Sequence, residues 1–590
     1  MFNQFKNSNA IRDLKPAELD ALTDEIATFL AQETRFDVET IIKNINVLET
    51  TLALHKVFDL NKDRVVFDGG QQVMTHKILT GRAQELALRT NIPLTLDATN
   101  PFDAYTGGDI GEGLGVGLAY ALDASQNHTI VVIDDHALNY GLTYETLVQI
   151  SKEKPNIIIV MIDEQQSLLR HYTSMNTFVK SIRISKTYTG LKKDMKTVLD
   201  SNPISRPILN TLVRVRDALK ETVLEPTIFT QFGIDYQGPI DGQNISDLVR
   251  VFEMAKTMKG PNLIHVQTRL RKKQRRKLEF PNFKLDDATP DNYKTYHEIF
   301  DSTLVGIRDP KLMLLVDALN FGDYFSEFAE AYPNNYVVTS GSTESLVTIA
   351  AGYVRMGYRV VVALSSQRVL EVQSHINNQF KLSELPLTLL IRGTGLNSTG
   401  NRFEQGVYDI GALEHLANVY MPKDLNEASG LLNKILQKPG INAIRYQNDA
   451  EKHMPQLLDL DAIWEIAHPF DISSDGVILT FGTSIQDFIK KIEANALNVG
   501  VVNTRNLSSV DSELLRKIAE FHHKILIYNI EDIHNELYHH ILRHCYEQKL
   551  DLEIHCVDLR GLELTAGSKE LKRAHHLHID DAIRLLIEGK

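Results

Sequence analysis

Short apolar runs rich in β-branched residues alternate along the chain with longer amphipathic segments. Segments such as Ile485–Ala494 and Ser512–Phe521 carry apolar residues at helical spacing. Consecutive strand–helix units connect almost always by right-handed crossovers, which produce a parallel sheet. The pattern therefore predicts an α/β protein built on parallel sheets. The runs expected to form strands are Thr129–Ile133, Asn156–Ile162, Asn262–Val266, Leu312–Val316, Tyr358–Leu364, Leu387–Ile391, Gly476–Thr480 and Lys524–Tyr528.

The alternating pattern falls into three successive blocks. A length of 590 residues has room for about three or four domains. The blocks predict three α/β domains, at residues 1–290, 291–455 and 456–590. A stretch of polar helical pieces without strand runs, at about residues 184–230, is interpreted as an insertion in the first domain.

Composition narrows the class of protein. The 63 Lys and Arg residues against 76 Asp and Glu residues give a formal net charge of −13, which argues against a dedicated nucleic-acid binder. Apolar runs long enough for a membrane helix and the apolar stretch of a secretion signal are both missing from the sequence. The only cysteines are Cys545 and Cys556, which excludes a disulfide framework. We therefore expect a cytoplasmic protein, with enzymes as the leading class.

Several motifs, in a consistent order and spacing, carry a resemblance to a known family. They resemble the 1-deoxy-D-xylulose-5-phosphate synthases, which are thiamine-diphosphate-dependent members of the transketolase superfamily. The resemblance extends over nearly the whole chain. The motifs are FDGGQQVMTHKILTGR at Phe67–Arg82, YTGGDIGEGLGVGLAYA at Tyr105–Ala121, FGIDYQGPIDGQ at Phe232–Gln243, YVVTSGSTESLVTIAAG at Tyr336–Gly352, EQGVYD at Glu404–Asp409 and DGVILTFGTS at Asp475–Ser484.

The resemblance implies a fold, an assembly and a reaction. It implies three parallel-sheet α/β domains of the transketolase type, a homodimer, and thiamine diphosphate with Mg²⁺ bound between the first and second domains. The family reaction is that of a transferase on small molecules. Pyruvate is decarboxylated and condensed with glyceraldehyde 3-phosphate, which supplies a precursor of isoprenoids and thiamine.

The resemblance assigns the magnesium ligands to Asp135, Glu164 and Gln166, and the same residues with Gly108 to cofactor binding. Mg²⁺ binds oxygen ligands, usually including one or two carboxylates and phosphate oxygens. An alternative remains open, in which Asp135 and Glu164 only cap strand ends and helix N-termini.

The turn around Asp135 departs from the family pattern. Asp134 and His136 stand where the family has glycines. Glycine lets a backbone turn approach a phosphate closely and adopt positive φ. Asp134 adds a negative charge beside a polyanion, and His136 adds bulk. The sequence therefore indicates a weakened site for a diphosphate.

The catalytic positions of the family have changed as well. The Glu that activates the cofactor is replaced by Thr343, and Glu344 follows one residue later, which is about 100° of rotation on a helix. His76 survives at a family-type active-site position, where a core role is equally open, and Arg368 stands at the position of the ring that stacks on the cofactor. Four family histidines are replaced, by Thr40, Gln71, Asp109 and Glu404.

The phosphate of the sugar substrate is bound in the family by arginines. The resemblance assigns this role to Arg392 and Arg445. Asn448 stands where another family arginine would lie. The expected phosphate site is therefore incomplete.

The carboxyl-terminal part of the chain is rich in histidine. His540 and His544 are spaced to lie on one helix face and to bind a transition metal. Cys-x-x-Cys and His-Glu-x-x-His spacings do not accompany them. A surface helix with titrating histidines is the alternative interpretation.

Two hypotheses follow for the function. In the first, the chain is an active synthase that uses Asp135 and Glu164 for Mg²⁺ and Glu344 as the activating acid. In the second, it is a degenerate paralogue that keeps the fold and the dimer and has lost thiamine diphosphate, so that its activity is lost or altered. The replaced residues favour the second hypothesis, and whether the chain is an enzyme stays open on the sequence alone.

Overall fold

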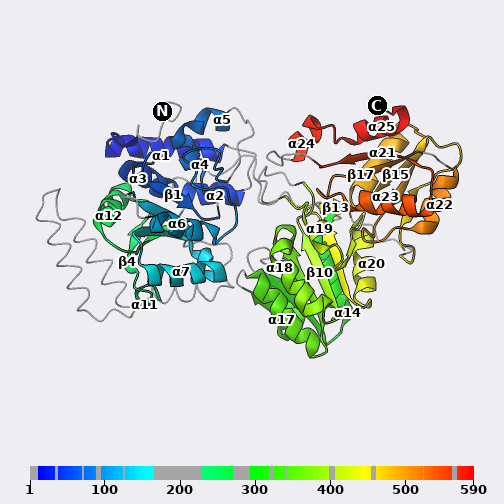
Figure 1. The fold of residues 1–590 in the computed structure, drawn as a ribbon, viewed down its shortest axis with the longest axis horizontal. Coiled ribbons are helices and arrows are strands. Elements are labelled where there is room, and N and C mark those ends of the chain that lie inside the picture. The colour runs from blue at the N-terminus through cyan, green and yellow to red at the C-terminus, as the bar shows by residue number, and fades with distance from the viewer. Residues whose placement is uncertain are drawn as a thin grey trace, which may run out of the picture. The chain divides into compact units, whose positions relative to one another are not determined.

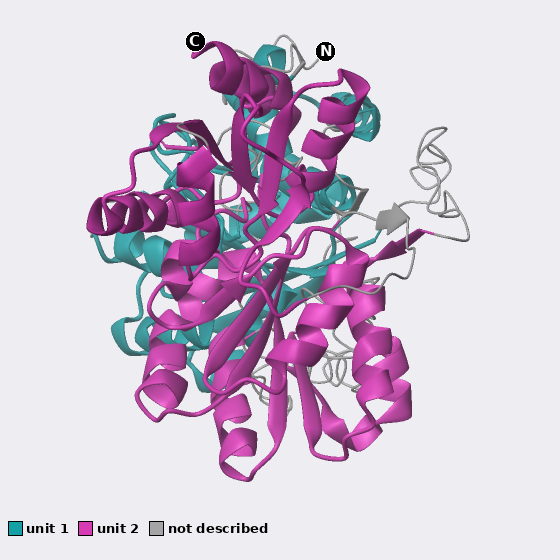
Figure 2. Cartoon of the chain, turned by 90° about the vertical axis from the view of Figure 1, so that its right-hand side faces the viewer, with its two compact units in different colours: residues 1–284 teal, residues 285–590 magenta. Residues whose placement is uncertain are grey.

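The structure is a computed structural model of the chain. It describes residues 11–32, 38–69, 72–87, 95–123, 127–164, 228–269, 293–317, 324–339, 342–396, 405–448, 450–452, 460–521, 524–560 and 568–589. The chain divides into two compact units, unit 1 (residues 1–284) and unit 2 (residues 285–590), which Figure 2 shows in different colours.

Unit 1 is organised around a five-stranded parallel sheet with the strand order β1-β2-β3-β5-β4 (Figure 1). The inner strands β2, β3 and β5 are buried along almost their whole length, as parallel strands covered on both faces should be. The strands are β1 (Arg64–Phe67), β2 (Thr129–Asp134), β3 (Ile157–Glu164), β4 (Asp235–Asp241) and β5 (Asn262–Thr268).

Helices of unit 1 pack on this sheet, and α6 approaches it most closely. A methyl group on Gly113 would lie 2.8 Å from the Cα atom of Asp68, and one on Gly117 would overlap the Val131 side chain. Glycine at these two positions therefore lets α6 pack closely on the sheet. The helical segments are α1 (Pro16–Ala31), α2 (Val38–Asn46), α3 (Leu48–Val57), α4 (Met74–Lys77), η3 (Ile78–Arg82), α5 (Ala83–Ala87), α6 (Glu112–Leu122), η4 (Asp135–Asn139), α7 (Gly141–Glu153), α11 (Ile228–Gln231) and α12 (Ile245–Thr257).

Unit 2 contains a six-stranded parallel sheet with the order β11-β12-β10-β9-β7-β8. Its strands are β7 (Leu312–Asp317), β8 (Tyr336–Thr339), β9 (Arg359–Ser365), β10 (Leu387–Arg392), β11 (Asn418–Tyr420) and β12 (Ile441–Tyr446). The accompanying helical segments are α14 (Tyr296–Ile307), α16 (Ser326–Ala331), η5 (Pro333–Asn335), α17 (Thr343–Arg355), η6 (Ser366–Arg368), α18 (Val369–Ile376), η7 (Asn377–Lys381), α19 (Asp409–Leu413) and α20 (Leu425–Ile435).

Successive residues of β9 pack into cores on opposite faces of this sheet. Val362 belongs to the core that contains Leu346 of α17, whereas Val361 belongs to the core that contains Phe300 of α14 and Leu432 of α20. Figure 1 shows α17 and α18 on one face and α14 and α20 on the other. The continuous apolar run of β9 is therefore explained by burial on both faces.

A second sheet of unit 2 has the order β14-β16-β15-β17-β18, in which β14 alone pairs antiparallel. Its strands are β14 (Glu465–His468), β15 (Gly476–Thr480), β16 (Val499–Asn503), β17 (Lys524–Asn529) and β18 (Glu553–Asp558). The helices are α21 (Ser484–Ala494), α22 (Ser512–Phe521), α23 (Glu536–Gln548), α24 (Ser568–Ala574) and α25 (Ile579–Glu588), and a small antiparallel ribbon joins β6 (Tyr293–Thr295) to β13 (Ala450–Lys452).

The α/β class with parallel sheets is confirmed, and each expected strand run lies within or closely overlaps a strand of the structure. The predicted boundary at residues 290 and 291 lies outside the described residues, as does the proposed insertion except for α11. The boundary at residues 455 and 456 falls inside unit 2, between its two larger sheets. The three-domain division stays a prediction. Within the described part of the chain, every helix is too short or too polar to cross a membrane.

Candidate functional site

The expected metal ligands of unit 1 lie at the carboxyl edge of its parallel sheet. Asp135 directly follows β2, and Glu164 ends the neighbouring strand β3, whose residue Ile162 is paired with Asp134. Gln166 lies outside the described residues, and Gly108 lies in the segment before α6. Parallel strands bring Asp135 and Glu164 to the edge where α/β proteins commonly bind ligands.

The Asp134 side chain occupies a backbone amide of the turn after β2 that a phosphate would otherwise bind. Its carboxylate accepts a hydrogen bond of 2.8 Å from the backbone amide of His136 and so caps the short helical turn η4. Burial alone would raise the pKa of Asp134, but His136 and a hydrogen bond with Asp135 hold that pKa below its usual value. The carboxylate is therefore already bound to this amide.

The ligand atoms of Asp134, Asp135 and His136 lie within 4.8 Å of one another. Such a set suits a cation, because two carboxylates and an imidazole offer only negative or neutral donors. It does not suit a diphosphate, because a phosphate oxygen would meet the Asp134 carboxylate where a glycine turn would offer an amide. The residues present therefore fit a metal ion and fit the diphosphate of the family cofactor poorly.

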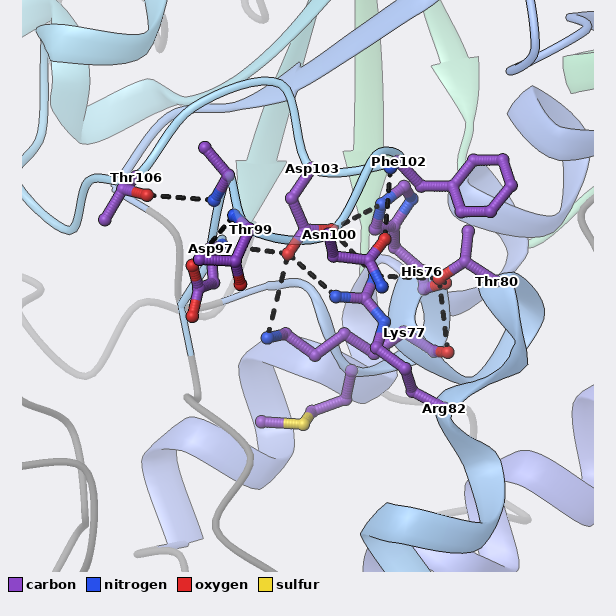
Figure 3. Close-up of polar contacts among 12 residues, drawn as sticks. His76, Lys77, Thr80, Arg82, Asp97, Thr99, Asn100, Phe102, Asp103 and Thr106 are labelled. Atoms are coloured by element: carbon purple, nitrogen blue, oxygen red, sulfur yellow. Dashed lines mark hydrogen bonds and ion pairs between the residues drawn. The ribbon is translucent and has the colours of Figure 1, made fainter.

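His76 lies in a fully buried polar cluster behind this edge (Figure 3). Its Nε2 atom lies 3.2 Å from Oδ1 of Asp103, and its Nδ1 atom lies 3.1 Å from Nε2 of His55. Arg82 donates to both oxygens of Asp103, at 2.8 Å and 2.7 Å, and the Lys77 ammonium is 3.9 Å from the same carboxylate. Both ring nitrogens of His76 are thus engaged by the interior.

The protonation of the cluster follows from its charges. Burial lowers the pKa of His55 and of His76, although Asp103 opposes the effect at His76. A neutral His76 donates its Nε2 proton to Asp103 and accepts the Nε2 proton of His55. The Nδ1 atom of His55 then has no hydrogen-bond partner among the described residues. This geometry favours the core role for His76 that the sequence left open.

In unit 2, helix α17 starts at the position of the activating residue. Ser342 caps the helix by accepting a hydrogen bond of 3.2 Å from the backbone amide of Ser345. The Thr343 side chain is 1% exposed, and its hydroxyl has no hydrogen-bond partner among the described residues. Glu344 is exposed and accepts a hydrogen bond of 3.0 Å from the Ser342 hydroxyl. Glu344 therefore points away from the face that buries Thr343.

Arg368 ends the short turn η6 that leads into α18. Its guanidinium forms an ion pair with Glu371, one helical turn later. Glu371 thus balances the charge of this largely buried guanidinium. Because the guanidinium is paired with Glu371, it is less available to stack on a cofactor ring.

The two arginines expected to bind phosphate, Arg392 and Arg445, differ in how deeply they are buried. Arg445 is fully buried, and its Nε and one terminal nitrogen donate to the two oxygens of Asp409 at 2.8 Å and 3.0 Å. The same terminal nitrogen also donates to the backbone oxygens of Gly406 and Glu531. Burial opposes the charge of Arg445, yet Asp409 raises the pKa of this guanidinium. A phosphate could reach Arg445 only if this ion pair opened.

Arg392 is only partly buried. Its Nε atom donates to Oδ1 of Asn448 at 2.9 Å, and its guanidinium lies 4.3 Å from the ring centre of Tyr324. The hydrogen bond thus joins the retained Arg392 to Asn448, which stands where the family has another arginine. Arg392 is accordingly the better placed of the two for an anionic ligand.

Two acidic residues that the sequence reasoning missed organise these clusters. Asp103 binds His76 and Arg82, and Asp409 binds Arg445 and accepts a hydrogen bond of 2.9 Å from the Ser366 hydroxyl. Asp409 ends the EQGVYD motif, which is the one signal that pointed to it. Among the replaced histidine positions, Thr40 and Asp109 are described, whereas Gln71 and Glu404 lie outside the described residues.

Comparison with known proteins shows what the chain is similar to. A family model of 1-deoxy-D-xylulose-5-phosphate synthase matches residues 2–268. The 1-deoxy-D-xylulose-5-phosphate synthase of Clostridium acetobutylicum is 27% identical over 100% of both chains. That of Syntrophomonas wolfei is 28% identical over 89% of this chain and 86% of its own, and that of Thermus thermophilus is 27% identical over 87% of both.

Two solved transketolases are also similar. A split-gene transketolase, described as an inactive beta4 tetramer, is 17% identical with a TM-score of 0.43 and covers 50% of this chain and 97% of its own. The transketolase of Campylobacter jejuni is 12% identical with a TM-score of 0.41 and covers 98% and 100%. By the family model over its first 268 residues and by the full-length curated relatives, the chain is similar to 1-deoxy-D-xylulose-5-phosphate synthases.

Proposed function

We propose that the chain is a degenerate paralogue of 1-deoxy-D-xylulose-5-phosphate synthase that has lost the thiamine-diphosphate-dependent condensation. The observation that carries this proposal is the buried Thr343 hydroxyl at the position of the activating Glu. A threonine hydroxyl does not ionise near neutral pH, so it cannot replace a carboxyl group in general acid–base catalysis.

The turn formed by Asp134, Asp135 and His136 in unit 1 supports the same proposal. The Asp134 carboxylate holds the amide of His136, and two adjacent carboxylates oppose a bound diphosphate. Losing several members of a catalytic set is not compensated by the members that remain. The proposal also includes a homodimer of the family type in the cytoplasm.

The alternative is an active synthase that uses Asp135 and Glu164 for Mg²⁺ and Glu344 as the activating acid. Partly exposed Arg392 is the observation that favours it, because a sugar phosphate needs a cationic partner. Under this alternative, Glu344 has to leave the hydroxyl of Ser342 and turn toward the buried side of α17.

Turnover distinguishes the two functions. The purified chain is incubated with pyruvate, glyceraldehyde 3-phosphate, thiamine diphosphate and Mg²⁺, and carbon dioxide release and product formation are followed. The degenerate paralogue gives no release above a protein-free control. Release that is abolished in E344Q and retained in E327Q, a carboxylate of α16 in the same unit, would establish the alternative.

A further inference from the structure

A pocket of about 320 Å³ lies in unit 2. Its wall includes residues that follow α19, residues of the loop after β16, and the first turns of α23. Three side chains that can bind a metal, Glu414, Glu536 and His540, line this pocket. All lie in unit 2, so the site does not depend on the placement of unit 1.

The three side chains converge from two elements. Glu536 and His540 are four residues apart on α23, a spacing that places both on one helix face. Glu414 follows α19 and brings its carboxylate to the same place, with Oε1 3.3 Å from Nε2 of His540. The ligand atoms of all three lie within 4.8 Å of one another. This distance is compatible with a single cation between them.

A backbone contact orients the His540 ring. Nδ1 of His540 lies 3.3 Å from the carbonyl oxygen of Leu507. A carbonyl oxygen only accepts, so Nδ1 donates to it and the ring presents Nε2 to the Glu414 carboxylate. Histidines that bind metals are held in the same manner, with the second nitrogen donating to a carbonyl or carboxylate.

The Oε1 atom of Glu414 is the point at which the ligand atoms meet, since Nε2 of His540 lies 3.3 Å from it. Nε2 of His415, on an 82% exposed side chain, is 3.4 Å from this oxygen and can complete the set.

We propose that Glu414, Glu536 and His540 bind a divalent transition-metal cation of the zinc type, with an open coordination position toward the pocket. Imidazole with carboxylates favours such an ion, whereas Mg²⁺ prefers oxygen ligands alone. The site joins the end of α19 to α23, and it is independent of the proposal on thiamine diphosphate.

The site differs from the one considered from sequence. His544 was the expected second ligand, but it is not part of the converging group, and its Nε2 atom is buried without a hydrogen-bond partner among the described residues. Glu536 takes the place of His544 by lying one turn before His540 rather than one turn after it.

Metal titration of the full chain tests the proposal. The protein is first freed of metal with a chelator, then titrated calorimetrically with Zn²⁺ and, in parallel, with Co²⁺ while visible absorption is recorded. We expect a Zn²⁺ site whose occupancy depends on Glu414 and His540, and Co²⁺ bands of a nitrogen- and oxygen-bound ion. We also expect Zn²⁺ affinity to fall about tenfold or more in both E414Q and H540Q.

Control variants separate this site from other histidines. H539Q changes the exposed neighbour on α23, and H544Q changes the alternative ligand, and both should bind Zn²⁺ as the unaltered chain does. Fluorescence of Trp464, the one tryptophan of the chain, checks that each variant is folded. The proposal is overturned if the unaltered chain binds no Zn²⁺, if folded E414Q and H540Q bind it unchanged, or if H544Q alone abolishes binding.

Discussion

Thr343 and Glu344 are adjacent in the first turn of α17, yet one side chain is buried and the other is exposed. Consecutive helical residues differ by about 100° in direction, so only one of the two can face the interior. The Ser342 cap fixes this register, because its hydroxyl binds both the amide of Ser345 and the carboxylate of Glu344. The Glu344 carboxylate therefore points about 100° away, around the helix axis, from the direction of the family Glu at position 343.

The unpaired hydroxyl of Thr343 predicts a stabilising substitution. T343V keeps the shape of the side chain and removes a buried polar group that has no hydrogen-bond partner among the described residues. We expect the free energy of unfolding of unit 2 to rise by about 1 kcal/mol. Urea denaturation followed by Trp464 fluorescence measures this change.

T348V is the matched control on the same helix. The Thr348 hydroxyl is exposed and donates to the backbone oxygen of Glu344 at 2.8 Å. Its removal should leave stability unchanged or slightly lower. A T343V variant less stable than T348V would contradict the burial of an unsatisfied hydroxyl.

The ion pair of Arg445 with Asp409 predicts a strongly destabilising substitution. D409N leaves the fully buried guanidinium without its countercharge. Breaking one side of a buried pair typically costs about 3–5 kcal/mol. We expect the urea midpoint of unit 2, again read from Trp464, to fall accordingly.

The exposed pair of Lys491 with Asp580 provides the comparison, with a distance of 2.6 Å between Nζ and Oδ1. D580N should change the free energy of unfolding by less than about 1 kcal/mol, as exposed ion pairs do. Equal effects of D409N and D580N would show that Arg445 is solvated and open to a phosphate.

The buried histidines of unit 1 predict a pH dependence. Burial lowers the pKa of His55 and His76 in the folded state, so below the ordinary value of about 6.5 the unfolded chain binds protons that the folded chain does not. Stability should therefore fall as the pH drops below about 6.5, by about 1.4 kcal/mol per pH unit for each histidine.

Hydrogen exchange of the β2 and β3 amides, corrected for the intrinsic exchange rate, follows unit 1 across this pH range. H55Q retains a donor for His76 and removes one titrating group, so it should reduce the slope. H576Q, whose ring is 83% exposed in unit 2, should leave the slope unchanged. A slope that is the same in H55Q and the unaltered chain would mean that His55 does not titrate on unfolding.

Most inner strands could be predicted from sequence because parallel strands buried on both faces are continuous apolar runs. The inner strands β12 and β16 were missed, since β12 contains Asn442 and Arg445, and β16 contains Gly500. The edge strands β4 and β18 were missed, since each begins with an acidic residue, Asp235 or Glu553, and carries further polar residues. Edge strands bury less of their surface, which weakens the pattern that identifies them.

The motifs located the candidate residues, but not their partners. Arg445 and Asp409 are 36 residues apart, and His76 and Asp103 are 27 apart, so neither pair has a local pattern. Arg445 was expected to bind a phosphate because the resemblance assigned it that role, whereas the structure buries it fully. Only the folded arrangement reveals that its charge is balanced inside the protein.

Calorimetric titration of the purified chain with thiamine diphosphate in the presence of Mg²⁺ tests the central claim most directly. The buried Thr343 and the Asp134 carboxylate on the His136 amide predict no binding heat up to millimolar cofactor. Saturable binding in the micromolar range would contradict the account, because it would mean that the cofactor site has survived these replacements.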